Sequence, residues 1–291
     1  MMEKQLLDII SNSLSDPSYL GDDCAVVKIA GEDYLFCLDN FIENTHFSSA
    51  YFKPEDIGWK ALAVNISDIA AMSGQALYAM VGLSLNKSIE DKEAWVKSFY
   101  QGMQLCADKF GGLKIIGGDI SSQEGFTSIS VALVGKTAKA TLRIAPVKAD
   151  YKVCVTGKFG NSRSFLDNPE TLNLDDRRYH LRPEPRLSEA QDLPLGAMMD
   201  ASDGLAASLY TLAEMNNIAI EIDSSLIPRD EHVSLDQALY GGEDYELVGL
   251  FNECPKNFTE IGVITYKDKQ QLVIDTSLNQ VIDKSQQYQH F

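Results

Sequence analysis

The chain is poor in basic residues. Lysine and arginine together number 25, against 42 aspartates and glutamates, so the formal net charge is −17 at pH 7. A surface of this sign repels nucleic acid and anionic lipid, and we expect neither as a partner. Most of the surplus acid serves solubility. An anionic substrate would need local positive charge, which bound metal ions can supply.

The chain also lacks the features of exported and membrane proteins. It has only five cysteines, at irregular spacing and with no Cys-x-x-Cys pair, which argues against a disulfide framework or a zinc knuckle. No apolar run approaches the length that spans a membrane. Residues 1–10 mix charged with apolar residues and predict an amphipathic helix rather than a signal peptide. These features predict a protein of the reducing cytoplasm.

Several common nucleotide and catalytic motifs are missing. Gly135-Lys136-Thr137 resembles the end of a Walker loop, but Ser130 stands where that loop requires its first glycine. The sequence contains no G-x-G-x-x-G and no G-x-S-x-G, and its four histidines do not have metal-ligand spacing. A P-loop, a dinucleotide-binding fingerprint, a hydrolase nucleophile elbow and a zinc site are therefore not expected.

What the chain does have is acidic residues beside glycine, serine and other turn-forming residues. Hard oxygen ligands of this kind suit Mg²⁺, which bridges to phosphate oxygens. A single Gly-Asp pair is an ordinary turn, but the repetition favours a metal-dependent enzyme that acts on phosphate groups. The segments are Gly21-Asp22-Asp23, Leu38-Asp39-Asn40, Ile66-Ser67-Asp68, Gly117-Gly118-Asp119, Asp200 to Gly204, and Gly241 to Tyr245.

Hydrophobic periodicity predicts that strands and helices alternate in both halves. The length of 291 residues is comfortable for two domains, and we place the boundary near residue 137. Each half mixes strands with helices, so the predicted class is mixed α/β. The predicted strands are 34–38, 76–85, 113–116, 127–134, 151–156, 218–222, 245–251, 262–266 and 271–275, and the predicted helices are 55–73, 90–110 and one that begins near 204.

The acidic segments occur in an order that resembles a known family. The matching stretches are Gly21 to Ala25, Asp39 through Phe47, Lys60 to Met72, Gly117 to Asp119, Ser202 to Leu205, and Gly242 to Leu247. Together they resemble the thiamine-monophosphate kinase family, within the superfamily of aminoimidazole ribonucleotide synthetase. The long stretch from Lys60 and the Gly-Gly-Glu-Asp-Tyr-Glu-Leu run are the most specific, and the resemblance covers nearly the whole chain.

This resemblance implies a two-domain fold like that of aminoimidazole ribonucleotide synthetase. Residues 1–137 would form an N-terminal α/β domain that binds metal and ATP and pairs across a homodimer. Residues 138–291 would form a C-terminal α/β domain that completes the phosphate and substrate site. The nucleotide would lie near the junction of the dimer.

The resemblance also assigns roles to individual residues. It implies that Mg²⁺ is held by Asp23, Asp39, Asp68, Asp119, Asp200 and Asp203. It implies that ATP is bound by Gly118, Asp119, Arg143, Ser202 and Tyr100, with Arg143 and Asp119 as the catalytic residues. It implies that thiamine phosphate contacts His46, Glu243 and Tyr288.

The chain departs from the family's usual wording in a few places. Cys37-Leu38-Asp39 stands where the family usually has Ser/Thr-Thr-Asp, so Cys37 or Leu38 could reach a metal only through a backbone carbonyl. Ser208 replaces an acidic residue common in relatives, and the last residues match the family's tail only in part. This makes Tyr288 a weaker match than the acidic residues.

The implied activity is ATP-dependent phosphorylation of thiamine monophosphate to thiamine diphosphate, the last step of thiamine diphosphate biosynthesis. It would use several Mg²⁺ ions and direct in-line transfer. Two alternatives remain at this point: a sibling ATP-dependent synthetase of the same superfamily, or a regulator that binds Mg²⁺-nucleotide without catalysis. The absence of cysteine from residues 1–20 argues against a selenophosphate synthetase, which needs a reactive thiol or selenol there.

Overall fold

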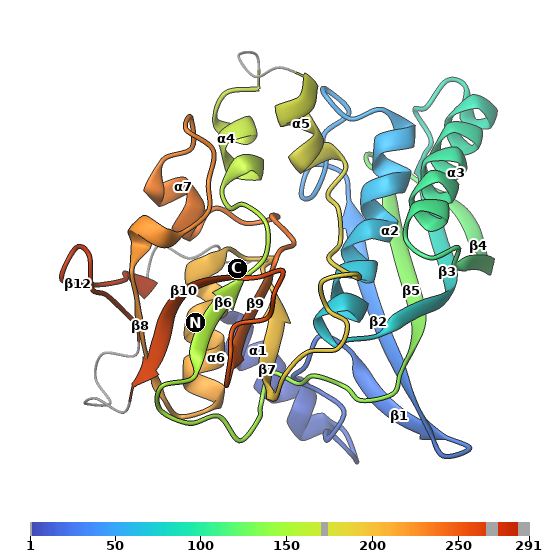
Figure 1. Ribbon diagram of the computed structural model, residues 1–291. Helices are drawn as coiled ribbons and strands as arrows, with labels where there is room; N and C mark the ends of the chain where they lie inside the picture. Colours follow the sequence, from blue (N-terminus) through green and yellow to red (C-terminus); the bar gives the residue numbers. More distant parts are fainter. Residues whose placement is uncertain (1, 170–173, 266–272, 285–291) are drawn as a thin grey trace.

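The first half of the chain builds a five-stranded sheet in the order β1-β2-β5-β3-β4 (Figure 1). A computed structural model describes residues 2–169, 174–265 and 273–284. Neighbouring strands of this sheet are antiparallel, except that β3 and β4 are parallel. Its strands are β1 (Ala25–Ile29), β2 (Glu32–Ile42), β3 (Gln75–Asn86), β4 (Lys114–Gln123) and β5 (Ser128–Thr137).

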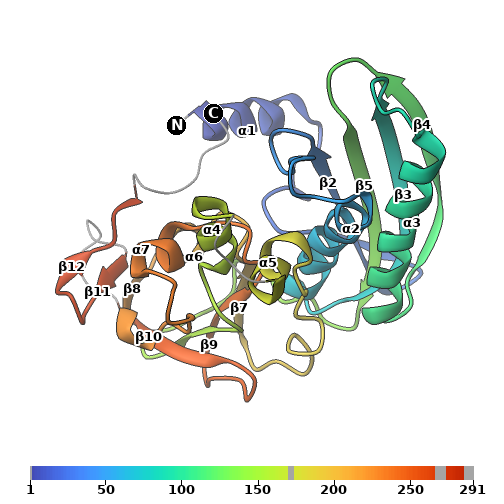
Figure 2. The same ribbon diagram turned by 90° about the horizontal axis from the view of Figure 1, so that it is seen from above.

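Helix α2 (Pro54–Ala71) lies on one face of this sheet, and α3 (Lys92–Lys109) packs beside it (Figure 2). The alternation in β3 follows from this arrangement: Val81 and Leu83 are buried on the helix side, whereas Tyr78 and Met80 are exposed on the other. The two helices approach so closely at Gly102 that a Cβ there would lie 1.8 Å from the carbonyl oxygen of Glu55. The sheet therefore has one covered face and one open face.

The second half of the chain builds a seven-stranded sheet in the order β12-β11-β8-β10-β6-β9-β7. Helix α6 (Leu205–Met215) packs on it and contributes Leu205, Leu209 and Leu212 to its core. The strands are β6 (Lys152–Val155), β7 (Gly196–Asp200), β8 (Ala219–Ile222), β9 (Leu247–Phe251), β10 (Thr259–Thr265), β11 (Val273–Asp275) and β12 (Gln280–Val281). The remaining helices are α1 (Met2–Ser13), α4 (Asn161–Asp167), α5 (Leu174–Leu181), α7 (Leu235–Tyr240) and the 3-10 helix η1 (Ser224–Leu226).

The two sheets meet where the edge strand β7 approaches α2. A small apolar cluster joins Ala70 and Ala71 of α2 to Met198, Leu247 and Phe251 of the second sheet. Each of these side chains is fully buried, so the contact excludes water and fixes the relative position of the two halves. The end of α2 and the end of β7 therefore lie side by side, and this junction positions the site described below.

The mixed α/β prediction is confirmed, and most predicted elements are present, including α2, α3, β3 and β5 at nearly the predicted bounds. Short elements such as β7, α4 and α7 were missed, because their residues are fixed by packing more than by a periodic pattern. Among the described residues, no helix is both long enough and apolar enough to cross a bilayer.

The expectation that the acidic residues occupy turns is wrong for Asp39 and Asp119, whereas Asp68 lies in the helix predicted over residues 55–73. Asp119 lies within β4, Asp39 within β2 and Asp68 in the last turn of α2. Gly118, which precedes Asp119, does not mark a turn. A Cβ at this position would lie 1.9 Å from the carbonyl oxygen of Val81 on the neighbouring strand. Glycine is thus required by close approach of two strands rather than by reversal of the chain.

Candidate active site

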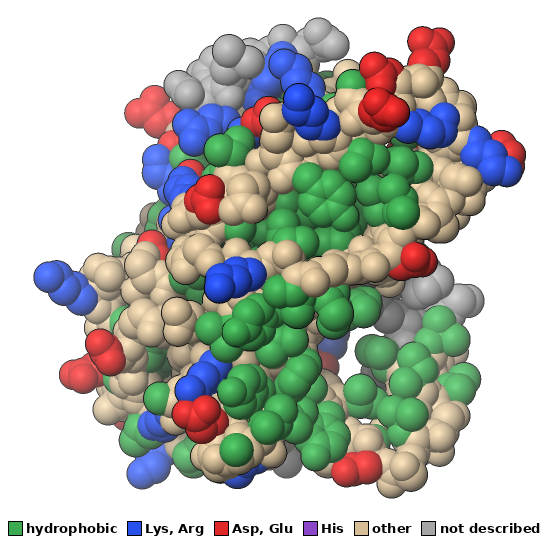
Figure 3. Space-filling model, turned by 90° about the vertical axis from the view of Figure 1, so that its right-hand side faces the viewer, with side chains coloured by type: hydrophobic (Ala, Val, Ile, Leu, Met, Phe, Trp, Pro, Cys, Tyr) green, Lys and Arg blue, Asp and Glu red, His purple; other side chains and the backbone are tan. Residues whose placement is uncertain are grey.

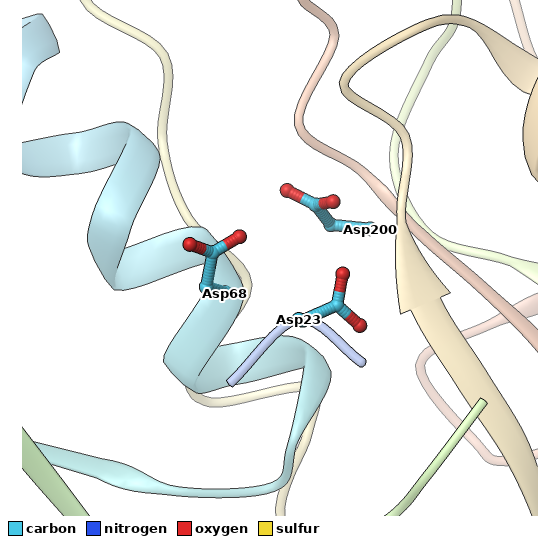
Figure 4. A group of neighbouring side chains, drawn as sticks. All are labelled: Asp23, Asp68 and Asp200. Atoms are coloured by element: carbon cyan, nitrogen blue, oxygen red, sulfur yellow. The ribbon is translucent and has the colours of Figure 1, made fainter. Parts of the chain in front are cut away.

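Three carboxylates converge at the junction of the two halves. Asp23 lies in the segment before β1, Asp68 in the last turn of α2 and Asp200 at the end of β7, and Figure 4 shows the three groups around one shared space. Ligand oxygens of all three lie within 4.8 Å of one another. Residues far apart in the sequence are therefore brought together by the packing of α2 against β7.

Local structure aims these side chains at one another. Gly21 has φ +101°, a backbone conformation that L-residues rarely adopt, and it turns the chain into Asp22-Asp23. Ser67 donates its hydroxyl proton to Asp200 Oδ2 at 2.6 Å. This bond links the last turn of α2 to the end of β7, and it holds the Asp200 carboxylate beside Asp68.

The grouping raises the pKa values of the acids. Burial, followed by the charges of Asp23 and Asp39, raises the pKa of Asp200 to about 8, although Ser67 and Arg143 oppose the rise. Burial and then Asp39 raise the pKa of Asp68 well above its ordinary value. Burial and then Asp23 raise the pKa of Asp39 to about 6. Carboxylates at this spacing resist ionising together unless a cation lies between them.

Arg143 compensates part of this negative charge. Its guanidinium is ion-paired with Asp23, and its backbone N–H donates to Asp22 Oδ2 at 3.1 Å. Asn216 holds the segment in place by donating to the Arg143 carbonyl at 2.8 Å. When the carboxylates of the cluster are ionised, their charge exceeds that of Arg143.

The donor set fits a hard divalent cation. Asp23 Oδ2 is buried and has no hydrogen-bond partner among the described residues, so one carboxylate oxygen of the cluster is left unsatisfied. Asp23, Asp68 and Asp200 offer only oxygen atoms to this space. The nearby thiol of Cys37 points toward Asn65 instead, with its sulfur 3.6 Å from the Asn65 carbonyl. Oxygen-only ligation favours Mg²⁺ over softer metals.

The carboxylates form one wall of a cleft of about 730 Å³, a size that suits a small-molecule ligand. Most of the residues predicted for the site line it, and they come from both halves of the chain. The lining residues are Asp22, Asp23, Leu38, Asp39, Asn40, Phe41, Thr45, His46, Val64, Asp68, Arg143, Arg163, Leu166, Asp200, Ser202, Asp203, Tyr240, Gly242, Glu243 and Tyr245.

The two predicted substrate contacts that the structure describes lie in this cleft. The backbone N–H of Ile42 donates to His46 Nδ1 at 3.1 Å, which fixes the orientation of the imidazole. Glu243 has φ +63°, and its backbone N–H donates to the Ser202 carbonyl at 2.6 Å. A left-handed conformation at a non-glycine residue is uncommon and is often found at functional sites.

Other predicted residues lie elsewhere. Gly118 and Asp119 are exposed on β4, and Tyr100 packs beside Phe99 on α3; none of the three lines the cleft of a single chain. Tyr288 falls outside the described residues. The structure thus brings together Asp23, Asp39, Asp68, Asp200 and Asp203 with Arg143, Ser202, His46 and Glu243.

Sequence reasoning missed several residues of the cleft wall, among them Asp22 and Tyr245. Asp22 accepts the Arg143 N–H, and Tyr245 is buried at the cleft with φ +53°. Burial and then the charge of Glu243 raise the pKa of Tyr245 well above its ordinary value. The doubled acids and the Gly-Gly-Glu-Asp-Tyr run were visible, but their side-chain directions depend on backbone angles that the sequence pattern does not encode.

Comparison with known proteins supports the resemblance. Residues 21–137 match the family model described as AIR synthase related protein, N-terminal domain. The chain is 34% identical to thiamine-monophosphate kinase of Bacillus subtilis, over 94% of this chain and 93% of that protein. It is also 34% identical to the thiamine-monophosphate kinase of Aquifex aeolicus, over 84% of this chain and 83% of that protein.

Solved structures agree. A structure described as AaThiL complexed with AMPPCP and TMP superposes with a TM-score of 0.88 at 31% identity, and the match covers 99% of this chain and 97% of that one. The hydrogenase maturation protein HypE of E. coli has a TM-score of 0.70 at 18% identity, which shows a shared fold alone. The predicted two-domain fold like that of aminoimidazole ribonucleotide synthetase is thereby confirmed. Its sequence, its fold and the acidic cleft between its two sheets together show that the chain belongs to the thiamine-monophosphate kinase family.

Proposed function

We propose that this chain transfers the γ-phosphoryl group of ATP to thiamine monophosphate, giving thiamine diphosphate and ADP. Membership of the family supports the reaction, as does the likeness to a solved structure complexed with AMPPCP and TMP. The observation that carries the proposal is the convergence of Asp23, Asp68 and Asp200 in a cleft of ligand size.

The chemistry of the acceptor explains why acidic residues suit the site. The second pKa of a phosphate monoester lies near ~6, so the acceptor oxygen is already anionic at neutral pH and needs no strong base. The obstacle is repulsion: two unit charges 4 Å apart interact by roughly 1 kcal/mol in water and about 4 kcal/mol at an effective dielectric of 20. Two phosphate-bearing substrates bring several such pairs together.

Asp23, Asp68 and Asp200 are the residues that would hold Mg²⁺, and Asp39 and Asp203 line the same cleft. When bound, Mg²⁺ supplies positive charge that screens the repulsion between the two phosphate groups. Arg143 keeps a fixed guanidinium at the same wall, where its pairing with Asp23 holds it beside the acidic cluster. Positioning and charge compensation then do most of the catalytic work.

In this proposal residues 1–137 bind metal and ATP, and residues 138–291 complete the phosphate and substrate site. His46 and Glu243 would contact thiamine phosphate, with Tyr288 as a further proposed contact. Ser202 would contact ATP from the cleft, and Gly118, Asp119 and Tyr100 from the first sheet and its helices. Cytoplasmic location also belongs to the proposal, and it rests on cysteine usage.

We also propose that the protein forms a homodimer. The open face of the first sheet carries Phe36, Leu38, Tyr78 and Met80, all exposed. Figure 3 shows hydrophobic side chains gathered over the side of the molecule that lies on the right in Figure 1, where the first sheet is. Exposed apolar patches of this kind favour association, and a second copy of the same sheet face would cover both.

Met80→Glu should convert a dimer to a monomer. The side chain is 45% exposed on the open face, so the charge is tolerated in the single chain but would be buried on association. Size-exclusion chromatography with light scattering measures the change. Leu105→Glu is the matched control, because Leu105 is similarly exposed but lies on α3, across the sheet. A monomeric parent protein, or a Met80→Glu variant that stays dimeric, would refute this interface.

Asp119→Asn should lower turnover by about 10²-fold or more, the scale for one preorganised electrostatic group. The melting temperature should not change, because Asp119 is exposed on β4 and the substitution breaks no buried ion pair. Steady-state ADP release and thermal unfolding measure the two effects, and Asp108→Asn on α3 serves as the control. Normal turnover in the Asp119 variant would remove this residue from the proposed metal and ATP site.

The decisive experiment for the function is a coupled ADP-release assay with thiamine phosphate, with and without Mg²⁺. We expect turnover that requires both, and ³¹P NMR should show the diphosphate product. Thiamine and thiamine diphosphate serve as control acceptors, because neither offers the same terminal monophosphate. ATP binding without turnover would favour the non-catalytic regulator, and ATP turnover with a different acceptor would favour a sibling synthetase.

A further inference from the structure

Lys60 is a fully buried basic residue that pairs with a residue of the cleft wall. It lies in α2, its side chain has no exposure to solvent, and its Nζ lies 5.4 Å from the ring centre of Phe52 and 5.9 Å from that of Phe41. Placing an ammonium group in such surroundings is costly unless a counter-ion accompanies it. An apolar residue here would avoid this desolvation cost, so the lysine calls for another explanation.

The counter-ion is Glu243, a residue of the cleft wall. Lys60 Nζ lies 3.0 Å from Glu243 Oε1, and the glutamate side chain remains 25% exposed toward the cleft. Glu243 also has the strained left-handed backbone conformation described above. The Glu243 carboxylate is thus buried at one end, where a charge-assisted bond holds it, and open at the other end. It is fixed in place rather than free to rotate.

His180 completes the arrangement without adding charge. Its Nδ1 lies 3.4 Å from Lys60 Nζ, 3.4 Å from Glu243 Oε2 and 2.9 Å from Ser162 Oγ. Burial and then Lys60 hold the pKa of this imidazole well below its ordinary value, so the ring is neutral. Lys60 is therefore the cation that pairs with Glu243, and the two residues form one unit.

We propose that Lys60 is a positioning residue that fixes the Glu243 carboxylate at the cleft wall so that it recognises the cationic heterocyclic half of thiamine phosphate. The inference rests on the proposed function. The thiazolium ring carries a permanent positive charge, and Glu243 shares the cleft with Phe41, Tyr240 and Tyr245, whose rings suit a flat cation. The phosphate end of the substrate is then directed toward the aspartate cluster.

The test compares two acceptors that differ only in this charge. Thiamine phosphate is set against its deaza analogue, in which a neutral thiophene replaces the thiazolium. Wild-type protein should prefer the cationic acceptor in kcat/KM by about tenfold or more. Lys60→Met should raise KM for thiamine phosphate about tenfold and reduce the preference to less than about threefold. KM for ATP should remain within about twofold of wild type.

Lys97→Met is the matched control, because Lys97 is exposed on the neighbouring helix α3 and lies far from the cleft. It should leave both the preference and KM unchanged. Lys60→Met with an equal loss toward the charged and the neutral acceptor would mean that Lys60 supports only the fold, and it would overturn the inference. So would an unchanged preference in the variant.

A double variant keeps the inference testable if Lys60→Met alone fails to fold. Lys60→Met/Glu243→Gln removes both charges, so no unpaired ion is left in the buried site. If the two residues act as a unit, the double variant should show the same acceptor preference as Glu243→Gln alone. A further loss of preference beyond Glu243→Gln would overturn the proposal. Absence of wild-type turnover with thiamine phosphate would instead refute the proposed function, which keeps the two failures distinct.

Discussion

Asp200→Asn should abolish most turnover and yet stabilise the metal-free protein. Asp200 is 2% exposed, and its neighbours Asp23, Asp39 and Asp68 repel its charge. The amide keeps the shape of the side chain and can still accept the Ser67 hydroxyl bond. It removes one negative charge from the cluster that is proposed to hold Mg²⁺. Function and metal-free stability should therefore change in opposite directions.

We expect kcat/KM to fall by about 10²–10³-fold, the scale for removal of one preorganised electrostatic group. The melting temperature without Mg²⁺ should rise by about 2–4 °C for each kcal/mol of repulsion relieved. The rise in melting temperature that Mg²⁺ gives the wild-type protein should be lost in the variant. ADP release and thermal unfolding with and without the metal measure these quantities.

Asp223→Asn is the matched control for this variant. Asp223 accepts a hydrogen bond from the Ser225 N–H at the start of η1, and asparagine caps a helix equally well. Turnover and the effect of Mg²⁺ should stay as in the parent protein. A lowered melting temperature in metal-free Asp200→Asn, or turnover within about threefold of wild type, would contradict the account of a repulsive acidic cluster.

The second prediction with a large effect concerns pH: the stability of the metal-free protein should fall as pH rises, and Mg²⁺ should counteract this fall. Burial raises the pKa of Asp22 and Asp39 to about 6 and that of Asp200 to about 8, from an ordinary value of 3.8. Between about pH 4 and pH 8 the folded protein therefore holds more protons than the unfolded chain. These three carboxyl groups make stability without metal fall as pH rises through this range, and they outnumber the single imidazole of His180, whose lowered pKa acts in the opposite direction.

Mg²⁺ competes with these protons, because it binds the ionised carboxylates. The rise in melting temperature on adding saturating Mg²⁺ should be small near pH 5 and should grow by several degrees toward pH 8. Thermal unfolding across this range, with chelator or with Mg²⁺, measures the difference. Sodium chloride at matched ionic strength is the control for simple screening. A metal-free melting temperature that stays constant or rises between pH 5 and pH 8 would contradict the shared acidic site.

Local patterns allowed much of the fold to be predicted. The stripe of Leu62, Ile66 and Ile69 predicted α2, and all three side chains are buried against the first sheet. Alternation predicted β5 in the same way. Patterns of this kind depend on residues a few positions apart, so a single chain is enough to read them. Elements such as α4 and β7 are short, and packing against distant residues decides them.

For the site, the sequence by itself determined the chemistry. It carries many oxygen ligands and few basic residues, and its acidic motifs occur in the order that is typical of the family. Only the tertiary structure decided which acids share one space. It placed Asp68 and Asp200 together because β7 packs on the end of α2, left Asp119 on an open strand, and paired Lys60 with Glu243. Motifs fix which groups a chain carries, whereas distances between them depend on long-range packing, which no short segment encodes.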